Sequence, residues 1–315
     1  DVPYGEDPGG NRPNNKYPLG YTWLKNVNRD DAPASGNFTV NFKQTDFKKT
    51  IKDSKGLNLK FTALNDWTPS SVGIAAGLPP LREENLVIPH FDYMLIHRYG
   101  NDLDTLFTSV IQPYKGEEYI ESMESVPLTC DGTEGELDAS RAVKVKLKSG
   151  RTDYIIYATN NELTYTLTDG DVSFDFNGFI GVYSVNEEGK NIYSYVNDGT
   201  KIGNVQAEAR YSGKVKSFTQ DLTDENEITV TLEKELTAEE IAALAGEYVY
   251  IDSDGRDNAV YKIEGASGSE NIITLDIGDV TTTRGYKSAS DPDAGYVYNI
   301  AEGSRMYIPL SFESY

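Results

Sequence analysis

The chain has 315 residues, and its 50 acidic residues outnumber its 29 basic residues, which gives a formal net charge of −21. Such a surplus of negative charge argues against a nucleic-acid binder and against binding to an anionic membrane surface, because phosphate recognition depends on lysine and arginine. The single cysteine, Cys130, excludes an intrachain disulfide and cysteine-based zinc modules. No apolar run approaches the roughly 18 residues that a membrane-spanning helix requires.

The composition favours an all-β chain with many turns, because tyrosine (22 residues) and glycine (28 residues) are abundant. Residues 1–36 are rich in turn formers and are interpreted as a loop or extended arm, with a short strand at Tyr21–Leu24. Apolar and polar residues then alternate over 38–42 and 57–63, which predicts strands with one buried face. Residues 65–89 are interpreted as a long connection, a kind of segment that is often functional.

Further strand patterns follow at intervals of about ten residues, which is typical of a β-sandwich. The predicted strands cover 91–99, 105–111 (ending before Pro113), 118–126, 142–148, 152–158, 163–167, 172–176, 178–185 and 192–196. We therefore expect a large antiparallel β-sandwich domain over residues 1–205.

The rest of the chain, residues 206–315, is predicted to be a smaller C-terminal β domain. Its strand patterns cover 213–219, 227–232, 248–251, 259–264, 271–276, 296–300 and 306–312. It also holds the only helical pattern, 237–246, where Thr237 and Glu240 form a capping-box signature and Gly246 is a stop signal. The predicted fold class is all-β, a large sandwich followed by a smaller β module with one short helix.

One segment of this C-terminal domain resembles an oxygen-rich calcium loop. Asp252, Asp254 and Asp257 surround Gly255 and could together hold a hard cation. No glutamate stands at the twelfth position and no helices flank the segment, so an Asp-Gly hairpin turn is the favoured interpretation. No other cofactor is indicated by the sequence.

The two histidines, His90 and His97, are candidates for contact with a ligand. Their odd spacing places them on opposite faces of a regular strand, so they cannot share a metal there. His97 shares a face with Tyr93, Leu95 and Tyr99, and a structural role at a sheet surface is favoured over a role as general base or charge neutraliser.

Lysines and loop aromatics complete the set of candidate binding residues. Lys144, Lys146 and Lys148 alternate with apolar residues and form a basic stripe, which is either a solvated strand face or a contact for an acidic glycan. Trp23, Trp67, Tyr114 and Tyr119 lie in or beside predicted loops, where aromatic rings could stack on sugars. The predicted substrate-binding residues are Trp23, Trp67, His90, His97, Tyr114, Lys144 and Lys146.

Several stretches occur in a characteristic order along nearly the whole chain. They are Tyr17–Val27, Asp92–Arg98, Leu103–Phe107, Val110–Gly116, Gly150–Ile156, Asp257–Tyr261 and Gly295–Gly303. Together they resemble the C-terminal β part of the heparinase II/III-like polysaccharide lyases of bacteria. The resemblance implies an N-terminal helical toroid followed by stacked antiparallel sheets, and β-elimination at a uronic acid.

In that family the catalytic asparagine, histidine and tyrosine come mostly from the toroid, and no residue of this chain is assigned to a catalytic position. The resemblance implies that this chain is the C-terminal β-sandwich portion of a secreted or cell-surface lyase. It would serve as a scaffold and as one wall of the substrate cleft for a helical catalytic domain, which belongs either to the same chain or to a separate one. Its implied ligand is an acidic, glycosaminoglycan-like polysaccharide of unspecified type. The alternative is a stand-alone carbohydrate-binding or cell-surface β-sandwich protein without catalysis.

Overall fold

The computed structural model of the chain describes residues 24–33, 37–44, 46, 49–64, 71–77, 91–130, 133–134, 140–252 and 259–315. In this part of the chain the sheets are antiparallel, and one α-helix and one 3-10 helix accompany them, so the predicted all-β fold is confirmed. None of the helices in these residues is long and apolar enough to cross a membrane.

The chain divides into two compact units, which are described separately. The first comprises residues 1–125 and 145–150, and the second comprises 126–144 and 151–315. The predicted domain boundary between residues 205 and 206 falls inside the second unit, and it stays a prediction.

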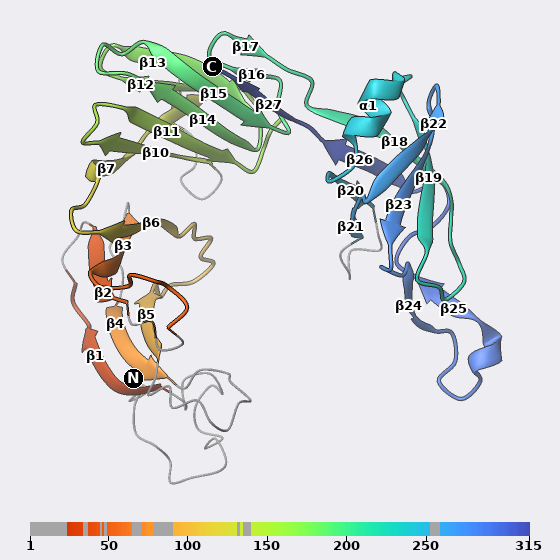
Figure 1. Cartoon of the computed structure of the whole chain (residues 1–315), viewed down its shortest axis with the longest axis horizontal. Coiled ribbons are helices and arrows are strands. Elements are labelled where there is room, and N and C mark those ends of the chain that lie inside the picture. The colour runs from red at the N-terminus through yellow and green to blue at the C-terminus, as the bar shows by residue number, and fades with distance from the viewer. Residues whose placement is uncertain are drawn as a thin grey trace. The chain divides into compact units, whose positions relative to one another are not determined.

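The first unit contains two three-stranded sheets (Figure 1). One has the order β1-β4-β5 and the other the order β2-β3-β6. The bounds are β1 Leu24–Asp30, β2 Phe38–Lys43, β3 Leu57–Leu64, β4 Ser71–Gly77, β5 Phe91–His97 and β6 Thr108–Lys115. The next strand, β7 (Ile120–Val126), lies beside the end of β10 that belongs to this unit, where Lys148 N donates to Tyr119 O over 2.9 Å.

Two features of the first unit correct the predictions from sequence. The segment 65–89 is not wholly a connection, since it contains β4, the central strand of its sheet. This strand consists mostly of small residues, so it lacks the alternation of apolar and polar side chains by which strands are usually predicted. The strand β6 does not end before Pro113 but continues to Lys115; because β6 lies at the sheet edge, a residue without an N–H is tolerated there.

The second unit contains a β-sandwich built from two sheets. The first has the order β27-β15-β14-β11-β10, and the second has the order β17-β16-β13-β12-β8-β9 (Figure 1). The bounds are β8 Leu128–Cys130, β9 Thr133–Glu134, β10 Ser140–Leu147, β11 Thr152–Ala158, β12 Tyr165–Asp169, β13 Val172–Asn177, β14 Ile180–Val185, β15 Asn191–Asn197, β16 Lys201–Ile202, β17 Val205–Gln206 and β27 Ser311–Ser314.

Alternate residues of both sheets form the core of this sandwich. Ile156 comes from the first sheet, and Leu167, Phe176 and Ile202 come from the second, all fully buried in one hydrophobic cluster. Cys130 packs against the same cluster and is half-buried. Along the strands that contain these residues, buried positions therefore alternate with more exposed ones, as the sequence predicted.

The C-terminal part of the second unit is a seven-stranded sheet with the order β21-β20-β26-β18-β19-β23-β22 and a separate two-stranded sheet β24-β25. The bounds are β18 Arg210–Phe218, β19 Asn226–Leu232, α1 Ala238–Ala243, β20 Tyr248–Ile251, β21 Val260–Lys262, β22 Gly265–Ser269, β23 Ile272–Gly278, β24 Thr283–Tyr286, η2 Pro292–Ala294, β25 Tyr296–Tyr298 and β26 Arg305–Pro309. The capping box of Thr237 and Glu240 at the start of α1 is confirmed.

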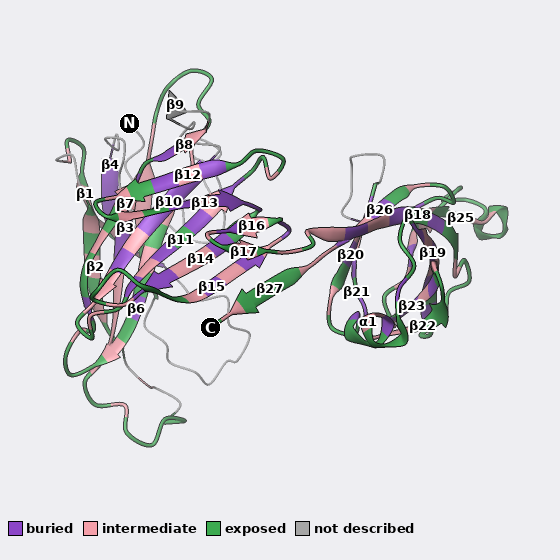
Figure 2. Ribbon diagram, turned by 90° about the horizontal axis from the view of Figure 1, so that it is seen from above, coloured by how far each residue is buried: buried purple, intermediate pink, exposed green. Residues whose placement is uncertain are grey.

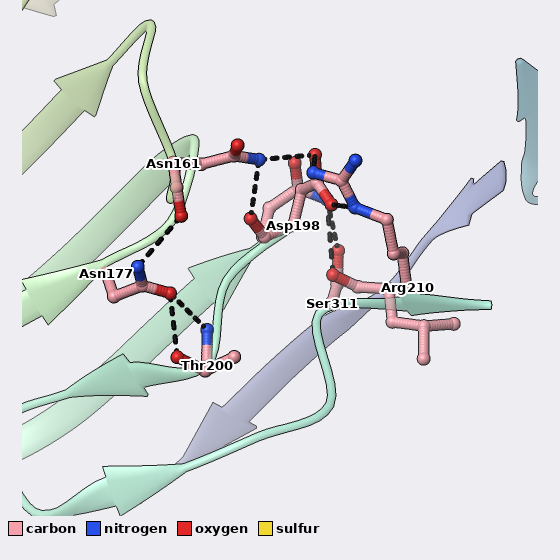
Figure 3. A network of polar contacts seen from close by, with 8 residues as sticks. Asn161, Asn177, Asp198, Thr200, Arg210 and Ser311 are labelled. Carbon is pink, nitrogen blue, oxygen red and sulfur yellow. Dashed lines mark hydrogen bonds and ion pairs between the residues drawn. The ribbon is translucent and has the colours of Figure 1, made fainter. Parts of the chain in front are cut away.

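A buried polar network lies where the chain passes between the sandwich strands and β18 (Figure 3). The carboxylate of Asp198, only 8% exposed, accepts hydrogen bonds from Arg210 Nε (2.7 Å) and Nη2 (2.8 Å) and from Asn161 Nδ2 (2.8 Å). The bidentate contact is a charge-assisted pair that connects Arg210, the first residue of β18, to Asp198, the residue after β15. Asn177 extends the network by accepting from Thr200.

Candidate functional site

One face of the β1-β4-β5 sheet in the first unit gathers residues that could bind a sugar acid. The register pairs Arg29 with Gly73, Gly73 with Leu95, and Ser71 with His97. Directly opposed residues of antiparallel strands point to the same side of a sheet, so Arg29, Leu95 and His97 share a face. We call this surface the β5 face; it also includes Tyr93 and Phe91, paired with Ala75 and Gly77.

The small residues of β4 allow larger side chains to lie over it. A Cβ at Gly77 would stand 2.5 Å from Cε2 of Tyr93, so the tyrosine ring occupies the space above this glycine. A Cβ at Gly73 would likewise be 3.7 Å from Cβ of Arg29. The glycine at position 77 thus lets an aromatic ring approach the middle strand closely, whereas at Gly73 the nearest atom is the backbone oxygen of Asn28 at 3.3 Å.

A histidine, a tyrosine and an arginine come together at the end of β5. His97 Nδ1 lies 3.1 Å from Tyr99 Oη, within hydrogen-bond distance, and the two rings meet edge to face with centroids 5.8 Å apart. Arg29 also forms an ion pair with Asp31, with Nε 2.6 Å from Oδ1. The arrangement places an imidazole and a phenol, two groups that exchange protons, within one hydrogen bond of each other.

Two effects lower the pKa of His97 below its usual value of 6.5. Burial of the ring is the larger one, and the positive charge of Arg29 is the other, since both disfavour the imidazolium. His97 is therefore neutral at neutral pH and can accept a hydrogen bond from a ligand hydroxyl or from Tyr99.

Aromatic rings on and beside the β5 face are open to solvent. Tyr99 is 67% exposed, and Phe91 and Tyr93 are also exposed. Exposed aromatic faces next to polar groups are suited to stacking on the apolar faces of sugar rings. The β5 face can thus offer rings for stacking, a neutral imidazole, and a guanidinium that a ligand carboxylate would have to take over from its present partner Asp31.

Of the residues predicted from sequence, His97 lies on the β5 face, and Tyr114 lies on the other sheet of the first unit, on β6. Tyr114 Oη accepts a hydrogen bond from Asn41 Nδ2 over 2.6 Å. Lys146 forms an ion pair with Glu121 (3.0 Å) in the first unit. Lys144, in the second unit, pairs with Asp169 (2.7 Å), whose carboxylate also accepts from Tyr154 Oη.

The predicted basic stripe is therefore largely neutralised where the structure describes it, because Lys144 and Lys146 both have carboxylate partners. Val143 and Val145 are buried, and Ala142 on the other side of the strand belongs to the hydrophobic cluster of the sandwich. Apolar and polar residues thus alternate over 142–148, but the side chain of Lys144 contacts Asp169 of the second sheet and is only partly exposed to solvent. Whether these lysines contact a glycan stays a prediction.

The remaining predicted residues lie outside the described part of the chain. These are Trp23, Trp67 and His90, together with Asp254 and Asp257 of the calcium candidate. Asp252 is described, and it accepts a hydrogen bond from Arg305 Nε over 2.9 Å. Among the described residues, no group of three or more His, Cys, Asp or Glu side chains could hold a metal ion.

The sequence did not indicate Arg29 or Phe91 as partners of His97. The alternation of β5 could have included Phe91, which stands two residues before Tyr93. Arg29 could not have been found in this way, because its place depends on the pairing of β1 with β4, whose register shifts between Lys25 and Asn28. No family model, curated protein or solved structure matches the chain.

Proposed function

We propose that this chain is the β region of a secreted or cell-surface polysaccharide lyase, and that it binds a uronate-containing polysaccharide through the β5 face. The observation that carries the proposal is the clustering of Arg29, His97 and Tyr99 beside exposed aromatic rings. The order of sequence stretches that resemble heparinase II/III-like lyases supports the same ligand class.

The chemistry of the β5 face suits a sugar acid better than a neutral sugar. An arginine donates charge-assisted hydrogen bonds to a carboxylate, and it does so from a fixed planar fork. With a net charge of −21, the chain as a whole repels polyanions, so binding of an acidic glycan must be local and sensitive to salt. The aromatic rings would supply the part of the affinity that does not depend on salt.

In this proposal the β region is a scaffold and cleft wall, and a helical catalytic domain supplies the groups that carry out β-elimination. The experiment is affinity electrophoresis of the purified chain in gels containing alginate, hyaluronan, chondroitin sulfate or heparin, at low and at physiological salt. We expect retardation by at least one polymer and its loss in Arg29→Gln. Tyr99→Ala should weaken retardation roughly 3- to 10-fold.

Arg305→Gln is the matched control, because Arg305 is an exposed arginine of the second unit that also pairs with an aspartate. Equal loss of binding in R305Q and R29Q, or no retardation by any acidic polymer, would contradict the proposal.

Absorbance at 232 nm during incubation of the chain with the same polymers detects the unsaturated uronate that β-elimination produces. A rise would place a complete active site inside these 315 residues, and it would make His97 and Tyr99 the first residues to replace.

A further inference from the structure

The outer face of the sandwich sheet in the second unit carries a separate cluster of aromatic residues. The register pairs Val182 with Tyr195 and Tyr195 with Glu313, so these three residues point to one side of the sheet. Tyr193 and Tyr315 lie on the same side, because each is two residues from a member of this row. We call the surface formed by Val182, Tyr193, Tyr195, Glu313 and Tyr315, together with Ile155 and Tyr157 of β11, the tyrosine face.

The tyrosine face is the side of the sheet that the sandwich core does not use. Ile156 and Val196, which alternate with its residues on β11 and β15, belong to the hydrophobic core on the opposite side. Along β11, β14 and β15, intermediate and exposed residues interrupt the buried ones, and β27 has no buried residue (Figure 2). Packing within the sandwich therefore does not explain why aromatic and branched residues occupy the outer positions.

Hydrogen bonds connect the tyrosine hydroxyls to neighbouring side chains. Tyr193 Oη donates to Glu313 Oε2 over 3.3 Å, and Tyr315 Oη donates to the same oxygen over 3.5 Å. The rings of Tyr193 and Tyr315 lie 5.2 Å apart. Tyr195 Oη lies 3.0 Å from Ser311 Oγ. A ligand that stacks on these rings would lose less conformational entropy of the protein than one that must order free side chains.

The exposed apolar area continues along the neighbouring strands. Tyr315 is 90% exposed, and Ile155 and Ile180 on β11 and β14 are exposed as well. Tyr157 packs edge to face on the exposed ring of Phe179, with centroids 5.2 Å apart. A contiguous surface of rings and branched side chains with a polar rim is the type of patch that binds a partner or ligand.

The charge of this surface favours an uncharged ligand. On the four strands the charged groups beside the aromatics are Glu313 and the pair formed by Arg151 and Asp153, whose Nε and Oδ1 are 2.6 Å apart. The net charge there is negative, within a chain that is itself strongly acidic, so uronate and sulfate groups would be repelled. An ionised carboxylate such as that of Glu313 instead accepts strong hydrogen bonds from hydroxyl groups.

We infer that the tyrosine face is a binding platform for a neutral, hydroxyl-rich polysaccharide, distinct from the β5 face. Sugar rings would stack on Tyr193, Tyr195 and Tyr315, and sugar hydroxyls would donate to Glu313. This inference does not depend on the function proposed for the β5 face, because the two surfaces lie in different units and share no residue.

The test is affinity electrophoresis of the whole chain in hydroxyethyl cellulose, arabinoxylan and galactomannan, with alginate as the acidic polymer. We expect retardation by at least one neutral polymer. Tyr315→Ala and Tyr195→Ala should each weaken it roughly 3- to 10-fold. Tyr286→Ala, which removes an exposed tyrosine from β24, should leave it unchanged. Since Tyr315 is almost fully exposed, its replacement should not affect folding.

Three results would overturn the inference. The first is the absence of retardation by every neutral polymer, and the second is equal retardation of the wild-type chain and both tyrosine variants. The third is a dimer in sedimentation velocity that Tyr315→Ala dissociates, because the tyrosine face would then be an interface between two copies of the chain. Arg29→Gln should leave retardation by neutral polymers unchanged, and a loss there would show that the two surfaces are not independent.

Discussion

Replacing Asn177 by alanine should destabilise the β-sandwich of the second unit strongly. The side chain is 8% exposed and makes four hydrogen bonds: Nδ2 donates to the carbonyls of Asn161 (2.8 Å) and Leu163 (2.9 Å), and Oδ1 accepts from the N–H (3.0 Å) and hydroxyl (2.7 Å) of Thr200. Alanine would leave two carbonyls, one N–H and one hydroxyl without these partners, and Figure 3 shows those of Asn161 and Thr200. At about 1 kcal/mol for each of these four groups, the free energy of unfolding should fall by about 4 kcal/mol.

The single cysteine offers a local probe for this measurement. Cys130 lies in the same sheet as Asn177 and is half-buried against the sandwich core, so we expect its thiol to react faster when this region opens. Brief pulses of a thiol reagent across a urea series give the fraction unfolded at each concentration, and hence the free energy of unfolding. A loss of 4 kcal/mol corresponds to a roughly 700-fold change in the unfolding equilibrium.

Asn186→Ala is the matched control. The side chain of Asn186 also accepts hydrogen bonds from two backbone N–H groups, those of Glu188 (3.1 Å) and Lys190 (2.9 Å), but it does so in an exposed hairpin where water can replace it. We expect a loss below about 1 kcal/mol there. If Asn177→Ala also loses less than about 1 kcal/mol, the reasoning from the hydrogen bonds of this buried side chain is wrong for this network.

Three further predictions concern charge and packing. Arg29→Gln should raise the pKa of His97 toward 6.5, since it removes the nearby positive charge, and an NMR titration of the imidazole would reveal an unchanged midpoint if the idea is wrong. The pKa of Glu240 is lowered to about 2 by the N-cap backbone N–H, so the stability that its carboxylate contributes is present above pH 4.5 and is lost as the pH falls toward about 2. Urea unfolding between pH 5 and 2 should therefore show a larger loss for the wild-type chain than for Glu240→Gln, and equal losses would contradict the assignment. Gly77→Ala should displace the ring of Tyr93, weaken binding of an acidic polysaccharide several-fold and lower the free energy of unfolding by about 1–3 kcal/mol. Unaltered binding would show that this ring makes no contact with the ligand.

The sequence by itself determined the class of fold and many of its strands. The alternation over Thr152–Ala158 predicts β11 to the residue, and the capping box of Thr237 and Glu240 predicts the start of α1. These features could be predicted because the information is local: a period of two follows from a half-buried strand, and a cap is satisfied by residues three positions apart.

Only the tertiary structure decided which strands are neighbours, and therefore which side chains meet. The strand β4 could not be predicted from its glycines and alanines, because its place depends on hydrogen bonds to β1 and β5 on either side. Arg29 reaches the surface beside His97 through that pairing alone, across about 68 residues of sequence. Tyr193 and Tyr315 are likewise more than a hundred residues apart and meet because β27 pairs with β15. The pattern within one strand predicts which face of the sheet a residue lies on. The register between distant strands determines which residues share that face, and this register is a property of the folded chain.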